Sequence, residues 1–124
     1  MQDDPDLLEL ISAARRFLEE EIVPALGDAR LRFRARVAAN LLAIAAREFR
    51  EEEDLTIGER RRLQGLLGTG EDSVAALNAE LERRIRSEEI EAGPGGAVWE
   101  HLRLTAIEKL RIANPAHLRR LGEA

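Results

Sequence analysis

The two histidines, His101 and His117, are the residues best suited to acid–base or metal chemistry, and they lie in different predicted helices. Neither has a carboxylate three residues before it, so the Glu-x-x-His pairs of di-iron bundles and the His-Glu-x-x-His zinc signature are absent. His101 precedes Thr105 and Glu108 by one and two helical turns, which makes a minimal acid–base cluster. Such a histidine is more typical of a partly buried side chain with a hydrogen-bond partner, so we expect no catalytic residue, metal or cofactor.

The glycine-rich turn Gly68-Thr69-Gly70 precedes a predicted helix, where free backbone amides attract anions. Glu71 and Asp72 follow at once and would repel a phosphate, and no P-loop lysine is present. We therefore interpret the turn as a helix stop and restart. The serines all lie within predicted helices, without an elbow motif or a paired base. The sequence gives no support to nucleophilic catalysis and predicts a non-enzymatic protein.

A cationic strip is the one candidate binding site. On a helix of 3.6 residues per turn, Arg36, Asn40 and Arg47 fall on one side of a predicted helix over residues 29–50. Guanidinium and amide groups together can recognise an anion. Two interpretations stay open: the strip faces an anionic ligand or partner, or it forms ion pairs with neighbouring acidic helices.

The net charge of −5 is sorted along the chain. Residues 3–23 carry seven acids and two Arg, residues 29–50 carry six Arg and one Glu, and residues 71–91 carry seven acids and three Arg. The favoured interpretation is a basic helix packed between two acidic ones, because opposite charges select the correct neighbours.

Nucleic-acid and membrane binding are not expected. A short helix over 57–67, a glycine turn and a helix over 71–90 match the outline of a helix-turn-helix, but the second helix is acidic and would repel phosphates. Membrane-surface binding needs exposed aromatic residues beside a basic face, whereas Phe33 and Phe49 belong to a predicted core stripe. The chain has no cysteine, no apolar run of spanning length and an acidic N-terminus, so we expect a cytosolic protein.

The composition predicts an all-α fold: one domain over residues 1–124, a bundle of five helices plus a short C-terminal helix. Leu and Ala supply 38 residues, whereas Val, Ile and Thr supply 15 and Tyr is absent. Capping residues and helix breakers predict where the elements begin and end. The first helix is capped by Asp4 and ended by Pro24 and Gly27, and a second helix runs over 29–50 before a frayed segment at 51–54.

A Thr56–Glu59 capping box opens a third helix over 57–67, and Thr69 caps a fourth over 71–90. A central helix over 97–113 is expected to bury Val98, Trp99, Leu102, Ala106 and Leu110, and Asn114 caps a short final turn.

The helix over 29–50 carries two faces that bear on packing. Its predicted core stripe consists of Phe33, Val37, Leu41 and Ile44, widened by Ala38, Leu42, Ala45 and Phe49. A second face of the same helix carries only small side chains and consists of Ala35, Ala39, Ala43 and Ala46. Small residues permit close helix approach, so this alanine face predicts a homodimer. The competing interpretation is that alanine is there only as the best helix former.

Four segments carry a resemblance to a known family: Phe33–Ile44, Ala76–Leu81, His101–Arg103 and Ala113–Pro115. They resemble an uncharacterised bacterial family of small stand-alone proteins, classed as a domain of unknown function, over most of the chain. Genes of such proteins often lie beside genes for aminoglycoside-phosphotransferase-like kinases and acyl-CoA-dehydrogenase-like proteins. The resemblance therefore implies a non-enzymatic accessory or interaction protein with a partner of either class, and it supplies no catalytic residue. The alternative is a helical bundle that binds a small anionic ligand.

Overall fold

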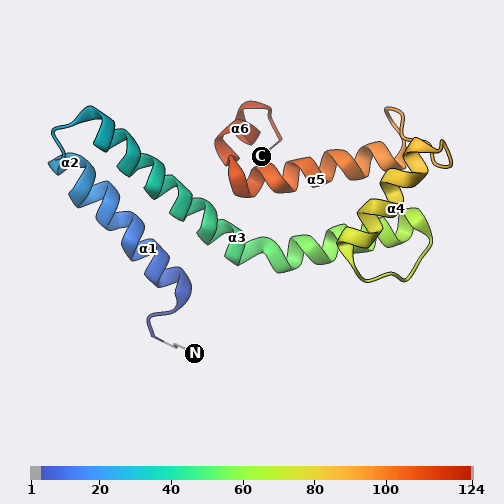
Figure 1. Ribbon diagram of the computed structural model, residues 1–124, viewed down its shortest axis with the longest axis horizontal. Helices are drawn as coiled ribbons and strands as arrows, with labels where there is room; N and C mark the ends of the chain where they lie inside the picture. The colour runs from blue at the N-terminus through green and yellow to red at the C-terminus, as the bar shows by residue number, and fades with distance from the viewer. Residues whose placement is uncertain (1–3, 124) are drawn as a thin grey trace. The chain divides into compact units, whose positions relative to one another are not determined.

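The structure is a computed structural model that describes residues 4–123, and these residues contain helices and no strand, which confirms the all-α prediction (Figure 1). The elements are α1 (Leu7–Phe17), the π-helical segment η1 (Leu18–Ile22), α2 (Val23–Ala25), α3 (Ala29–Leu67), α4 (Val74–Arg86), α5 (Ala97–Ala113) and α6 (Pro115–Arg120). The chain forms two compact units, residues 1–51 and residues 52–124, and their boundary falls inside α3. That all 124 residues act as a single domain stays a prediction.

Helix α1 begins two residues later than expected, because Asp6 and not Asp4 is the N-cap. The Asp6 carboxylate accepts a hydrogen bond from the backbone N–H of Glu9 at 2.8 Å, and the Glu9 carboxylate accepts one from the backbone N–H of Asp6 at 2.8 Å. This is a reciprocal capping box. Asp4 as a cap would place the apolar Leu7 at the reciprocating position, so local hydrogen bonding selects Asp6.

The helical path continues from α1 through η1 and α2, and the backbone turns extended at Leu26. The N–H of Val23 donates to the carbonyl of Leu18, five residues back, as in a π-helical turn. Pro24 has no N–H to donate, so a widened turn just before it lets the chain pass the proline while staying helical. The helical path thus ends between Pro24 and Gly27, the two residues expected to end it.

Helix α3 merges the two helices that we expected over 29–50 and 57–67, which corrects the predicted break at residues 51–56. Glu51, Glu52, Glu53 and Asp54 lie in mid-helix, where no exposed carbonyl end disfavours their charge, and glutamate is a good helix former. Gly58 costs about 1 kcal/mol relative to alanine, which does not break a helix held on both sides. The end of α3 is as predicted: Gly68 takes φ +65° and donates to the carbonyl of Gln64.

The faces of α3 in the first unit are the reverse of those expected. Ala39 and Ala46 are buried, with 2% and 9% of their surface exposed, so the alanine face predicted to carry a dimer packs inside the unit. Phe33 and Leu41 of the predicted core stripe are 66% and 59% exposed. The connection over residues 26–28 makes α1 and α3 antiparallel neighbours, and small side chains allow the closer approach.

The second unit has a core of leucines and one valine from three helices: Leu63 and Leu67 of α3, Leu77 and Leu81 of α4, and Val98 of α5. Helix α4 is shorter at both ends than the predicted 71–90. Its N-cap is Ser73, whose hydroxyl accepts from the N–H of Ala76 at 3.2 Å, so the predicted cap at Thr69 is wrong. Thr69 instead accepts from the N–H of Glu71 within the turn.

Helix α5 has the predicted bounds, and Asn114 caps α6 as predicted by accepting from the N–H of His117 at 3.1 Å. The predicted buried face of α5 is wrong in part, because Trp99 and Leu102 are about half exposed. The residues of α5 that are buried are Val98 and His101. The inward-facing side of α5 therefore includes polar residues, and these residues contact α3.

Candidate functional site

The predicted cationic strip lies on α3 in the first unit. Arg36 and Asn40 are exposed, and no residue between 4 and 123 makes a hydrogen bond or ion pair with either side chain. Arg47 is half-buried and has an interaction partner. At 1.5 Å per residue, Arg36 and Arg47 lie roughly 16 Å apart along the helix axis. Arg36 and Asn40 are thus one turn apart and can share one anion, whereas Arg47 is too distant to join them on a small ligand.

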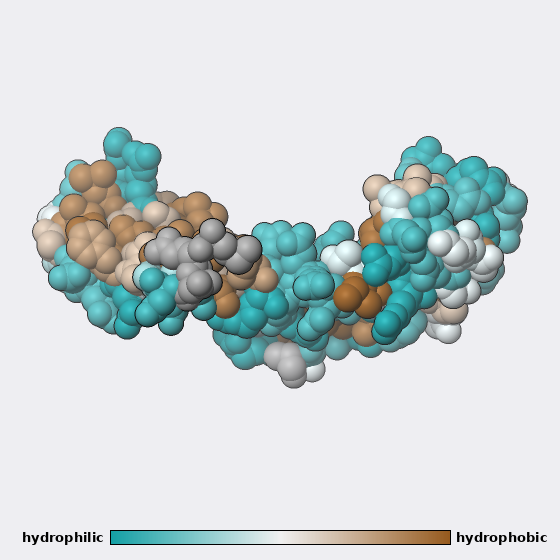
Figure 2. Space-filling model, turned by 90° about the horizontal axis from the view of Figure 1, so that it is seen from below, coloured by the Kyte–Doolittle hydropathy of each residue, from teal (hydrophilic) through white to brown (hydrophobic). Residues whose placement is uncertain are grey.

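Aromatic residues are on the surface throughout this chain. It has three Phe, one Trp and no Tyr, and all four aromatic side chains are between 46% and 66% exposed. Large apolar side chains on two neighbouring helices of the first unit form a surface that we call the apolar face; its members are Leu7, Leu10, Phe17, Leu31, Leu41 and Phe49. Figure 2 shows hydrophobic residues gathered over this unit. Exposed apolar surface of this kind typically marks an interaction site.

A second, polar constellation joins α3 to α5 in the second unit, and its centre is Arg62. Arg62 donates from Nε to His101 Nδ1 at 3.2 Å and from Nη2 to the Thr105 hydroxyl at 3.3 Å. It also donates from Nη1 and Nη2 to the two carboxylate oxygens of Glu108, at 3.1 and 2.7 Å. His101 is 3% exposed, and the ion pair is largely buried.

The histidine in this constellation is held neutral. Burial, and then the positive charge of Arg62, lower the pKa of His101 below its ordinary value of 6.5, whereas Glu59 and Glu108 act in the opposite sense. Because Nδ1 accepts from Arg62, the proton of the neutral ring is on Nε2. Protonation at Nδ1 would break that hydrogen bond and place two cations side by side.

The reactive atoms of this constellation are already engaged. The Nδ1 lone pair of His101 and both carboxylate oxygens of Glu108 accept hydrogen bonds from Arg62, so one guanidinium holds both side chains in place. The sequence had placed His101, Thr105 and Glu108 on one line of one helix, which the structure confirms. The sequence analysis had not identified Arg62, which lies 39 residues before His101. The only signal for an inward side chain at this position is its neighbour Leu63, which is buried.

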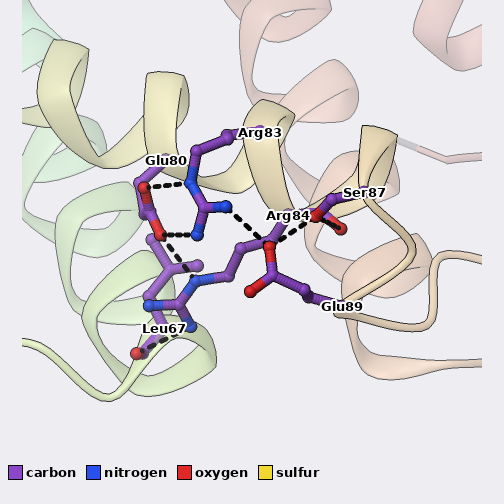
Figure 3. Close-up of polar contacts among 6 residues, drawn as sticks. All are labelled: Leu67, Glu80, Arg83, Arg84, Ser87 and Glu89. Carbon is purple, nitrogen blue, oxygen red and sulfur yellow. Dashed lines mark hydrogen bonds and ion pairs between the residues drawn. The ribbon is translucent and has the colours of Figure 1, made fainter.

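Ion pairs on α4 hold the end of that helix and its junction with α3 (Figure 3). Arg84 donates to Glu80 at 2.8 Å and to the carbonyl of Leu67, the last residue of α3, at 3.0 Å. Hydrogen bonds from Arg83 and Arg84 lower the pKa of Glu80 from 4.5 to about 2. Hydrogen bonds from Ser87 and then Arg83 lower the pKa of Glu89. Every charge in this group has a partner within the group, which indicates a structural role.

A side-chain hydrogen bond joins α3 to α4. The Asn78 amide donates to the Glu59 carboxylate at 3.3 Å. Asn78 also borders a shallow depression of about 380 Å³ between α4 and α5, whose apolar lining is Leu81, Ile85 and Leu102. A smaller depression of about 260 Å³ adjoins Leu102 and is lined by Trp99 and Arg103. Leu102 and Trp99 thus form a second exposed apolar patch.

Within residues 4–123, no group of three or more His, Asp or Glu side chains is placed to hold a metal ion. No helix in the described part of the chain is long and apolar enough to cross a bilayer.

Comparison with known proteins identifies the chain at the level of a family. No curated protein and no solved structure matches the chain. A family model described as a domain of unknown function, DUF6285, matches residues 24–117, which include all of α3, α4 and α5. The match covers both the exposed α3 surface and the Arg62 constellation, and the chain therefore belongs to the DUF6285 family.

Proposed function

We propose that this protein is a non-enzymatic interaction protein of the cytosol, which acts by binding a phosphotransferase-like or acyl-CoA-dehydrogenase-like protein. The observation that carries the proposal is the exposure of every aromatic side chain in the chain. Tryptophan and other large side chains supply most of the binding energy at protein interfaces. A chain that leaves them in water loses hydrophobic stabilisation, which association recovers.

The chemistry of the polar groups supports the same proposal. In the Arg62 constellation, the acceptor atoms of His101 and Glu108 are taken up by the arginine. A general base needs a free lone pair within reach of a substrate, and the single lone pair at Nδ1 of His101 is occupied by Arg62. On the second unit, Trp99 and Leu102 form the exposed apolar patch that we assign to the metabolic partner.

Affinity purification from the source organism under gentle conditions tests the proposal. The tagged chain should recover a phosphotransferase-like or acyl-CoA-dehydrogenase-like protein in stoichiometric amount, and Trp99→Ala should reduce that recovery. Lys109→Ala, an exposed change elsewhere on α5, should leave recovery unchanged and serves as the control. Failure to recover such a partner, together with turnover of an acyl-CoA or nucleotide by the purified chain, would overturn the proposal.

The second candidate function is binding of a small anion by Arg36 and Asn40, with Arg47 further along the helix. It is favoured by the exposed Arg36 and Asn40 side chains, which lack partners among residues 4–123. Calorimetric titration of the full chain with inorganic phosphate and with acetyl phosphate tests it. Saturable binding that is lost in Arg36→Ala and kept in Arg34→Ala would support this function, and heats equal to those of dilution would exclude it.

A further inference from the structure

The first unit lacks a core of its own. Of its described residues only Val23, Ala39 and Ala46 are buried, and two of these are alanines. A pair of helices in contact through small side chains gains little hydrophobic stabilisation, and helices of this length depend on tertiary packing to stay folded. The large apolar side chains that would normally form the core are the members of the apolar face. This unit therefore needs a permanent cover over that face.

The apolar face is continuous across the two helices. On α1, the Leu10 and Phe17 side chains are displaced around the helix axis by about 110° from the half-buried Ile11. On α3, Leu41 and Phe49 are displaced from the line of Ala39 and Ala46 by roughly 60 to 160° in the same rotational sense.

In two antiparallel helices, displacements in the same sense bring residues to the same side of the pair. The members from α1 and α3 thus lie on one side of the hairpin. The Arg36 and Asn40 side chains are displaced in the opposite sense and point away from that side.

The size of the apolar face matches half of a dimer interface. A large apolar side chain has about 200 Å² of accessible surface, and each of the six members is about half exposed. Six such residues present on the order of 600 Å², so two copies would bury about 1,200 Å², the lower edge of the range for stable specific interfaces.

The charges of the two helices fit a second copy of the same hairpin. Residues 4–25 carry six acids and two Arg, whereas residues 29–50 carry six Arg and one Glu. A two-fold axis parallel to the helices places α1 of each copy on α3 of the other, so opposite charges meet across the interface. An axis perpendicular to the helices places α1 on α1 and α3 on α3, which brings like charges together.

We propose that a second copy of the chain covers the apolar face, with α1 of each copy packed on α3 of the other in a four-helix arrangement. This inference rests on the proposed function in one respect: the chain acts by binding proteins, and its first partner is itself. The Trp99–Leu102 patch stays available for the metabolic partner. The face that carries the dimer is the large apolar one, in place of the alanine face that the sequence had suggested.

Solution mass of the full chain tests the dimer. Light scattering at micromolar concentration should give twice the monomer mass of 13.9 kDa. Leu41→Glu should weaken the dimer at least a hundredfold, because two carboxylates would be buried without partners. Leu121→Glu alters a residue of the second unit with nearly equal exposure, 58% against 59%, and should stay dimeric. A mass of 13.9 kDa at every concentration, or a Leu41→Glu chain that dimerises as tightly as the native one, would overturn the inference.

The melting temperature of the native chain gives a measurement that does not depend on a variant folding. For a dimer it rises with chain concentration, and for a monomer it does not. A melting temperature that is independent of concentration therefore also counts against the dimer.

Disulfide trapping tests the orientation, because the chain has no cysteine of its own. Chains that carry only Leu7→Cys are mixed with chains that carry only Phe49→Cys and oxidised. The parallel axis sets the two positions at the same level in different copies, so the mixed disulfide should dominate. Products that link two chains of the same variant would overturn the proposed packing.

The outcomes for the two proposals differ. A monomer that still recovers a phosphotransferase-like or acyl-CoA-dehydrogenase-like partner removes the dimer and leaves the proposed function. A dimer with the expected disulfide that recovers no such partner removes the proposed partner and leaves the dimer.

Discussion

Arg62 of α3 donates its Nε–H to Nδ1 of His101 on α5 at 3.2 Å, so a cation is the hydrogen-bond donor to a buried imidazole. The same guanidinium holds both oxygens of Glu108. The polar part of the contact between α3 and α5 thus consists of one arginine with three partners on successive turns of α5. It requires that Nδ1 of His101 carry no proton, because that atom accepts from Arg62.

The first prediction concerns pH. The pKa of His101 is lowered in the folded state, so in the interval below 6.5 the unfolded chain binds the proton more readily. The contribution of His101 is therefore fully present above pH 6.5 and is lost as the pH falls below that value. Urea denaturation should show a loss of stability between pH 7.5 and 5.5 that is smaller in His101→Asn. His117→Gln should keep the native pH dependence, and equal profiles for all three chains would contradict this account.

The second prediction concerns the Arg62–Glu108 pair. Arg62→Met leaves a largely buried carboxylate without its partner, which should cost about 2–3 kcal/mol of unfolding free energy. Arg62→Met combined with Glu108→Leu should recover much of that loss, because no unpaired charge stays behind. Denaturant titration of the single and double variants completes the cycle. Additive losses in the double variant would show that the two side chains do not interact.

The third prediction compares two glycines with open space around them. A Cβ atom at Gly65 or at Gly68 would meet no atom within 4 Å, but Gly68 has φ +65° and Gly65 lies inside α3. Gly65→Ala should stabilise the chain by about 0.5–1 kcal/mol, because alanine is the better helix former. Gly68→Ala should destabilise it by about 1–2 kcal/mol, because the left-handed conformation strains a Cβ. Thermal melts of both variants check the opposite signs.

The fourth prediction concerns the cap of α4. Ser73→Ala removes the hydroxyl that accepts from Ala76 and should cost about 1 kcal/mol. Thr69→Ala is the matched change at the residue that the sequence had indicated as the cap, and it should cost less, because Thr69 accepts only within the preceding turn. Equilibrium unfolding of the two variants decides between these caps. A larger loss for Thr69→Ala would restore the earlier start of the helix.

Much of the fold follows from local sequence. The bounds of α5, the stop at Gly68 and the cap at Asn114 depend on residues within one turn, so they could be predicted from sequence alone. The line of His101, Thr105 and Glu108 on α5 follows from helical spacing. The choices of Asp6 over Asp4 and of Ser73 over Thr69 were missed, because several residues in each segment can cap and the hydrogen bonds actually formed decide between them.

Tertiary structure alone decided which surfaces of α3 are buried. The sequence identified both its large apolar stripe and its alanine face, but helical periodicity does not say which of two apolar faces the neighbouring helix covers. In the first unit α1 packs on small residues, and Leu41 and Phe49 stay exposed. Arg62 joined His101 for the same reason: they are 39 residues apart, and contacts over that separation are set by how helices pack, which no local pattern records.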